Sequence, residues 1–500
     1  MNLDWIEEAV PDVLNRRLDA SGFLPIDRED RRYAMDHLGL PPSFQPSRAS
    51  AIRLAQTLDA NDLIFGSFTV TGSRIRVSAR VLDIQALHLS PPVEEEAEMT
   101  NLLTVLNSVA WRIARQLDPR FPVALHTFVS ADPGLSAGVF EDYIRGLIDD
   151  TDTTERIRRL KEAVRLDPAF TPALMDLGKA YFSDQQYEAA AQMLGRLPRN
   201  DPQAREADFY RGLAYLYVGS YAKAEDAFAF VGDQLPLPEV LNDQGVAASR
   251  RGKDGTALFR RAAAADPDNA DYEFNLAVSL DRRKDYGGAL LAVDQALKLR
   301  PQDAEAQTLQ ASIRAESSSA PAAHADPPSG ASADPAPASD EETGPLERVA
   351  RDFNEASFRQ AAFAMEQMQA AQMNSWPAAR HAQALAEEGS AFLDQGLILE
   401  AEREFQSALE IDSGNAAAHA GLAVIRQRDG DSQAARQEAQ QSLQAKPNAA
   451  AYLVLARLDL ESHQTLQAAA DVSSALKLEP QNAAARGLRQ QLEARGQSVP

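Results

Sequence analysis

Apolar and polar positions alternate with a helical period along most of the chain, and a proline closes the pattern at regular intervals. These closing prolines lie 31 to 35 residues apart, at Pro133, Pro168, Pro202, Pro236, Pro267 and Pro301. A proline ends a helix because it lacks an amide donor and its predecessor avoids helical dihedral angles. A period of this length predicts pairs of helices that repeat in space and bury their apolar faces against their neighbours.

The same residue types return at the same place in successive units. The first helix has a small residue near its middle, a tyrosine lies in the seam between the helices, and an alanine follows in the second helix. These positions are Gly178, Tyr187 and Ala190 in one unit, Gly212, Tyr221 and Ala224 in the next, and Ala277, Tyr286 and Ala289 near the end. The pattern resembles the tetratricopeptide repeat family, and the resemblance implies stacked helix-turn-helix units that form α-solenoids.

The resemblance implies a mainly α chain with two such arrays. The first covers residues 131–314 with about five helix pairs, and the second covers residues 346–496 with three pairs and capping helices. Residues 315–345 are rich in Ala, Pro and Ser and cannot offset the entropy of ordering, so we expect a disordered linker there. The second array would open with a long helix from Leu346 to about Met373, whose Met and Phe residues either cap the array or contact a partner.

Residues 1–120 have a different pattern, which predicts a small α/β domain before the arrays. Helical spacing occurs at residues 3–20, 46–58 and 99–117, a short apolar run at 23–26 predicts a strand, and residues 63–84 alternate like a β-hairpin around a turn at 71–73. These segments resemble the bacterial amino-terminal domain of TolB and of FlgO-like proteins, but that family's first strand is missing. We expect either a start upstream of Met1, with that strand and a signal sequence or anchor, or a degenerate domain that closes its sheet another way.

Composition narrows the possible chemistry. Fifty Lys and Arg against 73 Asp and Glu give a net charge of −23, which disfavours nucleic acid as a partner because phosphate binding needs a positive surface. The absence of cysteine excludes disulfides, thiol catalysis and cysteine zinc sites. The seven histidines lack metal-ligand spacing, and no phosphate-binding loop or catalytic motif occurs, so we expect no enzyme activity, no metal and no cofactor.

Two further features bear on surface and compartment. Arg74, Arg76 and Arg80 recur on one side of the predicted hairpin, and this basic stripe either meets an acidic partner or is the solvent face of an antiparallel sheet. No apolar run approaches the ~18 residues that a membrane span requires. As written, the chain has no signal peptide, which indicates a cytoplasmic protein, with the periplasm or cell envelope as the alternative if the start lies upstream.

The remaining candidate site is the concave groove of the first array. In tetratricopeptide proteins, the residues two before, one after and four after a Leu-Gly or Arg-Gly signature tend to line this surface. Carried over to this chain, with Tyr217 added, the rule gives an apolar, aromatic groove: Met175, Lys179, Phe182, Phe209, Leu213, Leu216, Tyr217, Phe274, Val278 and Asp281. Such a groove suits an extended peptide or a partner helix, although the same side chains could instead pack on neighbouring repeats.

The sequence therefore predicts a non-enzymatic scaffold or adaptor that binds protein or peptide partners through its repeats. The alternative is the sensory or regulatory subunit of a bacterial signalling system whose output domain lies on another chain, because this combination of domains accompanies such outputs in the resembling families.

Overall fold

The computed structural model describes residues 3–40, 47–130, 135–149, 152–319, 346–350 and 355–499. They form two compact units, one of residues 1–138 with 363–500 and one of residues 139–362. Most of the predicted linker, residues 320–345, lies outside the described residues. Within the described part, no helix is both long and apolar enough to cross a membrane.

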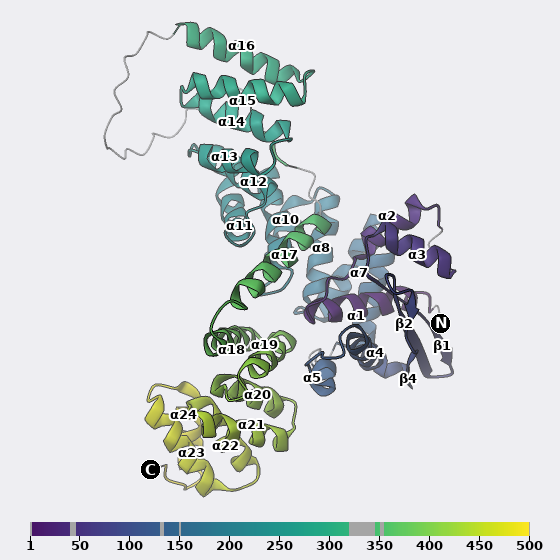
Figure 1. The fold of residues 1–500 in the computed structure, drawn as a ribbon, viewed down its shortest axis with the longest axis vertical. Coiled ribbons are helices and arrows are strands. Elements are labelled where there is room, and N and C mark those ends of the chain that lie inside the picture. Colours follow the sequence, from purple (N-terminus) through teal and green to yellow (C-terminus); the bar gives the residue numbers. More distant parts are fainter. Residues whose placement is uncertain are drawn as a thin grey trace. The chain divides into compact units, whose positions relative to one another are not determined.

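The first array consists of five antiparallel helix pairs and a closing helix, as the periodicity predicts (Figure 1). Its helices are α6 (Ala137–Ile148), α7 (Thr153–Leu166), α8 (Thr171–Ser183), α9 (Tyr187–Leu194), α10 (Ala204–Tyr217), α11 (Tyr221–Gln234), α12 (Pro238–Ser249), α13 (Thr256–Ala265), α14 (Ala270–Arg282), α15 (Tyr286–Leu299) and α16 (Ala304–Ser319). The first helices of neighbouring pairs lie side by side, in the order α8, α10, α12 and α14, and α16 lies next to α14.

Glycine in the first helix of a pair allows the second helix to approach closely. A β-carbon at Gly212 would lie 2.7 Å from the ring of Phe228, and one at Gly245 would lie 2.8 Å from the ring of Phe259. Both rings are fully buried. The recurring glycine is therefore a packing requirement of the helix pair, which is why it repeats with the period.

Residues 346–350 depart from the predicted helix. Helix α17 is described over Glu355–Met373, whereas Leu346–Ala350, where the helix was expected to begin, have no regular secondary structure. These five residues belong to the same unit as the first array. Side chains of that array bond to the backbone of Arg348 and Ala350, so these groups have partners without forming a helix.

The other unit contains the amino-terminal α/β region and the second array (Figure 1). The α/β region has α1 (Ile6–Ala20), α2 (Arg28–His37), α3 (Arg48–Thr57), β1 (Asp62–Thr71), β2 (Arg74–Asp83), β3 (His88–Leu89), β4 (Val93–Glu98), η1 (Met99–Asn101), α4 (Leu102–Leu117) and α5 (Leu125–Ser130). The second array has α18 (Ala378–Gln395), α19 (Ile398–Ile411), α20 (Ala416–Arg428), α21 (Ser432–Ala445), α22 (Ala449–Glu461), α23 (Thr465–Leu478) and the closing α24 (Ala483–Ala494).

The sheet is antiparallel, with β2 between β1 and β4 and with β3 pairing the end of β2. The predicted hairpin is present, and the alternate residues Ile75, Val77, Ala79 and Val81 of β2 are buried on the side of α4. The apolar run at residues 23–26 is not a strand. Its Phe23 ring packs on that of Phe121 at 6.4 Å, and the carbonyl of Ile26 accepts a hydrogen bond from the side chain of Asn15, not from a strand.

The α/β region bonds to the second array through the segment that follows α4. The amide of Ala124 donates to Glu402 Oε1 (3.2 Å), and Thr127 Oγ1 donates to Asp429 Oδ2 (2.8 Å). Arg426 donates to Thr127 Oγ1 (2.7 Å) and pairs with Glu402, whose side chain is fully buried. The second array is thus fixed to residues of the amino-terminal region by a buried polar network.

Candidate functional site

The structure places most of the predicted groove residues inside the array. Six of them are buried: Met175, Phe209, Leu213, Leu216, Phe274 and Val278. Lys179, Phe182 and Asp281 are partly buried, and Tyr217 is 39% exposed. The buried members contribute to packing between helices, so any contact with a partner falls to the members that reach the surface.

Three of these surface members come together on α8 and α10. The ring of Phe182 lies 5.4 Å from that of Tyr210 and 6.0 Å from that of Tyr217, and Tyr217 stacks on Tyr187 at 4.5 Å. Lys179 Nζ lies 5.4 Å from the centre of the Tyr210 ring and also bonds to a neighbouring carboxylate. We call Phe182, Tyr187, Tyr210 and Tyr217 the aromatic cluster. Phe182 and Tyr217 are members of the predicted groove, whereas Tyr187 of α9 and Tyr210 of α10 are not.

A second part of the same array binds a stretch of the chain itself, residues 346–350, which has no regular secondary structure. Asn275 on α14 contacts both backbone groups of Arg348: its Nδ2 donates to the carbonyl (2.7 Å), and its Oδ1 accepts from the amide (2.7 Å). Asn242 on α12 donates to the same carbonyl (3.0 Å), and the two asparagines bond to each other (2.7 Å). Both asparagines are fully buried. These contacts read backbone alone and would accept any side chain at this position.

The side chain of Glu347 enters a basic pocket at the carboxyl ends of α12 and α14. Its carboxylate accepts from Arg250 Nε (3.1 Å), from Arg282 and from the hydroxyl of Ser249, and its side chain is fully buried. Arg250 also donates to the Glu347 carbonyl (3.1 Å). The carboxylate is therefore held by charge-assisted hydrogen bonds, which are about twice as strong as neutral ones.

The side chain of Arg348 enters an acidic pocket at the amino ends of α14 and α16. Its guanidinium makes two bonds to Asp303 (2.6 and 2.8 Å), one to Asp271 (2.8 Å) and one to Glu305 (2.8 Å). It also lies 3.8 Å from the centre of the Phe274 ring. The hydrogen bonds from Arg348 lower the pKa of Asp303 to about 2, so the carboxylate stays charged at any physiological pH.

Asp243 on α12 binds the backbone of the segment two residues after Arg348, at Ala350. Its Oδ1 accepts from the amide of Ala350 (2.8 Å) and from Asn242 Nδ2 (2.9 Å). Burial raises the pKa of Asp243 to about 8, although these two hydrogen bonds act in the opposite direction. Ala350 itself packs on the apolar cluster of Leu241 and Tyr272.

These residues lie outside the predicted groove. Gly245 of α12 follows Gln244, so this unit lacks the Leu-Gly or Arg-Gly signature, but the same positions counted from Gln244-Gly245 are Asn242, Val246 and Ser249. Asn242 and Ser249 both contact the bound segment. On α14 the contacting residue is Asn275, next to the Phe274 that the rule selects. For Asn242, the missing signal was a polar residue at a position where other units have Met175, Phe209 and Phe274.

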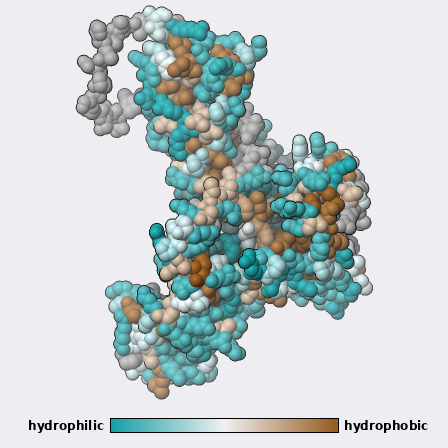
Figure 2. Space-filling view, viewed as in Figure 1, coloured by the Kyte–Doolittle hydropathy of each residue, from teal (hydrophilic) through white to brown (hydrophobic). Residues whose placement is uncertain are grey.

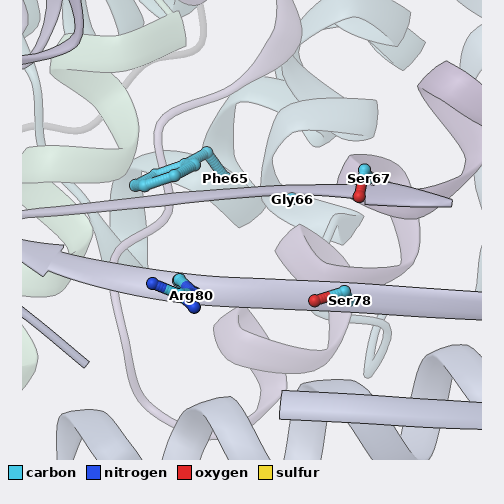
Figure 3. A pocket seen from close by; sticks show the side chains of 5 residues that line it. All are labelled: Phe65, Gly66, Ser67, Ser78 and Arg80. Carbon is cyan, nitrogen blue, oxygen red and sulfur yellow. The ribbon is translucent and has the colours of Figure 1, made fainter. Parts of the chain in front are cut away.

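The amino-terminal sheet has a shallow hollow of about 230 Å³, lined by Phe65, Gly66, Ser67, Ser78 and Arg80 of β1 and β2 (Figure 3). The basic stripe runs along the same face of β2. Arg74 and Arg76 pair with Glu96 on β4, at 2.9 and 2.6 Å. Two of the three stripe arginines therefore have an internal acidic partner.

Other surfaces offer less chemistry. The visible face of the second array is mostly hydrophilic (Figure 2). Across the described ranges of the chain, no group of three or more His, Asp or Glu residues could hold a metal ion.

Solved structures of repeat proteins are similar to this chain. A structure described as "Crystal structure of MamA" is 18% identical with a TM-score of 0.29, covering 31% of this chain and 92% of that one. MamA from Desulfovibrio magneticus RS-1 is 19% identical with a TM-score of 0.31, covering 34% of this chain and 100% of that one. YrrB, described as a TPR protein with an unusual peptide-binding site, is 14% identical with a TM-score of 0.32, covering 42% of this chain and 99% of that one.

Family comparison gives a match in each array. One tetratricopeptide repeat profile matches residues 147–214, and a second matches residues 243–304 and 386–450. A comparison with curated proteins gave no match. Together with the helix pairs and their glycine contacts, these matches show that the chain carries tetratricopeptide repeats in both arrays.

Proposed function

We propose that the chain is a non-enzymatic scaffold that binds peptide or protein partners through the first helices of its repeats. One observation carries the proposal: an extended segment, Leu346–Ala350, lies across α12, α14 and α16 and is bonded through its backbone. A surface that holds one extended segment of chain has the donors and acceptors to hold another. Extended peptides are commonly recognised in this way, by backbone contacts that give affinity and pockets that give specificity.

The stacked repeats supply a preformed surface for such binding. Each helix pair is fixed by buried contacts, such as that between Gly212 and the Phe228 ring, so a ligand meets side chains that are already in place. Preorganisation lowers the entropy cost of association. The aromatic cluster of α8, α9 and α10 adds an apolar and polarisable contact area next to Lys179. The net charge of −23 supports protein in place of nucleic acid as the partner class.

The proposal is tested by affinity capture with the intact chain from an extract of its own source, with bound proteins identified by mass spectrometry. The test variant is Phe182→Ala with Tyr217→Ala, because these side chains belong to the aromatic cluster and reach the surface. The control is Leu291→Ala on α15, a residue that is 76% exposed and outside the cluster. We expect specific proteins to be lost from the test variant and retained by the control.

Circular dichroism of each variant establishes that the repeats are still folded. An identical set of captured proteins for wild type, test variant and control would contradict a binding role for the aromatic cluster. Capture of nothing above background by the wild-type chain would contradict the scaffold function itself.

A further inference from the structure

The face formed by α12, α14 and α16 has basic residues along one edge and acidic residues along the other, and the bound segment contacts both edges. Arg250 and Arg282 lie at the carboxyl ends of α12 and α14, while Asp271 and Asp303 lie at the amino ends of α14 and α16. Between these basic and acidic rims lie the two asparagines that bond to backbone. The face therefore has three adjacent functions: an anion pocket, a backbone clamp and a cation pocket.

The bound dipeptide Glu347-Arg348 matches this arrangement. Successive side chains of an extended chain point in opposite directions, so neighbouring residues can enter pockets on opposite rims. Glu347 enters the basic pocket and Arg348 enters the acidic one. Reversing the order would put each charge against its own sign, because Asn275 fixes the direction of the backbone through both the amide and the carbonyl of Arg348.

We propose that this face is a binding site for an extended peptide that carries an acidic residue followed by arginine, and that residues 346–350 occupy it as an internal competitor. This inference rests on the proposed function and names the chemistry of its partner. A partner segment with the same dipeptide binds by displacing the chain's own segment, so that the array is closed until such a partner is present.

The contacts of the segment are those of an exchangeable ligand. Glu347 and Arg348 are held through polar bonds, and Leu346 is 56% exposed. Val349 and Ala350 are partly buried, and Ala350 packs on an apolar cluster of the array. The neighbouring apolar cluster consists of residues of α14, α15 and α16, and the Arg348 guanidinium lies against its Phe274 ring. The array thus has its own cores, and the segment adds a polar layer on top of them.

Tethering gives the internal segment an advantage over a free peptide. The segment is joined to the end of α16 by 26 residues, 320–345, of the same chain. Short flexible tethers in general produce effective concentrations on the order of millimolar. For an intrinsic dissociation constant of tens of micromolar, the internal segment would weaken binding of a free peptide about 10- to 100-fold.

The test measures binding of a fluorescein-labelled peptide with the sequence of residues 343–352 by fluorescence anisotropy. It is added to the intact wild-type chain and to the intact double variant Glu347→Ala with Arg348→Ala, which opens the face without altering any repeat. We expect the peptide to bind the double variant about 10- to 100-fold more tightly than the wild type. A second peptide, with glutamate and arginine interchanged, should not bind either chain.

A matched pair of substitutions in the opened chain locates the site. Arg282→Ala removes a donor to the Glu347 carboxylate, and we expect it to weaken peptide binding at least about tenfold. Arg283→Ala is the control, because this neighbouring arginine pairs with Asp254 and not with the segment. Its peptide affinity should equal that of the opened chain.

Three results would overturn the inference. Equal affinity of the peptide for wild-type and opened chains would show that the internal segment does not compete. Failure of the peptide to bind a folded opened chain would show that residues 346–350 are a structural staple and not a ligand. Equal binding of the interchanged peptide would show that the two pockets do not select charge. If captured partners still depend on the aromatic cluster in any of these cases, the scaffold function stands and only this inference fails.

Discussion

The carboxylate of Glu347 should account for most of the affinity between the segment and the first array. Its side chain is fully buried against Arg250 and Arg282, which are 22% and 29% exposed. A net hydrogen bond to a charged group contributes about 1.5–3 kcal/mol, and the two arginines can be rehydrated once the carboxylate is gone. For Glu347→Ala we expect docking to weaken by about 2–4 kcal/mol, which lowers the equilibrium constant for docking about 30- to 700-fold.

Hydrogen exchange with mass spectrometry reads this change directly. In the docked segment the amide of Arg348 donates to Asn275 and that of Ala350 donates to Asp243, so both are protected. In Glu347→Ala we expect a peptic fragment containing residues 346–350 to exchange faster, while the fragments of α8 to α11 keep the wild-type rate.

The substitution of a second acidic residue at the same site, Glu305→Ala, serves as the control. Glu305 also bonds to Arg348, but its side chain is 70% exposed, and an exposed ion pair contributes about 0–1 kcal/mol. Glu305→Ala should therefore speed exchange no more than about fivefold. If the two substitutions have equal effects, burial does not rank the contacts of this site, and the reasoning is refuted.

Three further outcomes follow from packing, charge burial and titration. A β-carbon at Gly421 would lie 2.1 Å from the buried ring of Phe405, so Gly421→Ala should lower the denaturation midpoint of its unit. A β-carbon at Gly487 would meet nothing within 4 Å, so Gly487→Ala should raise the midpoint because alanine favours the helix over glycine by about 1 kcal/mol. Arg426→Ala leaves the buried Glu402 carboxylate without its cation, and we expect the free energy of unfolding measured by urea denaturation to fall by about 3–5 kcal/mol. Burial raises the pKa of Asp243 to about 8, above its unfolded value, so its contribution to stability is greatest below pH ~4 and is lost as the pH rises through about 8. The wild type should therefore lose more stability between pH 6 and 8.5 than Asp243→Asn. Equal losses would contradict the raised pKa of Asp243.

The repeats could be predicted because their defining contacts are local. Gly212 on α10 contacts Phe228 on α11 of the same helix pair. Because the same contact recurs in successive units at the same spacing, it produces a period in the sequence. The hairpin of β1 and β2 is local in the same sense. Strand β4 was missed because its Val93–Glu98 sequence has four glutamates, yet Glu96 lies opposite Arg76 and pairs with it. Cross-strand charge, not apolar alternation, marks this strand.

The bound segment could not be predicted from periodicity, because its contacts join residues far apart in the chain. Arg348 lies 73 residues from Asn275 and 106 from Asn242. No repeat spacing connects them, and residues 346–373 taken alone have a helical pattern. The local preference for helix was overridden at residues 346–350 by side chains that bond to extended backbone.

A polar pair inside an apolar repeat still carries information about function. Asn242 and Asn275 are fully buried. Leaving a buried side-chain amide without a hydrogen-bond partner costs more free energy than a typical hydrogen bond contributes to stability. The two asparagines bond to each other, Asn242 also donates to Asp243, and both contact the backbone of Arg348. The array therefore offers hydrogen-bonding groups to an occupant with an exposed amide and carbonyl at this place, which any extended chain supplies. Replacing the internal segment by a partner segment exchanges like for like at the asparagines, so the charged pockets on either side decide which chain is held.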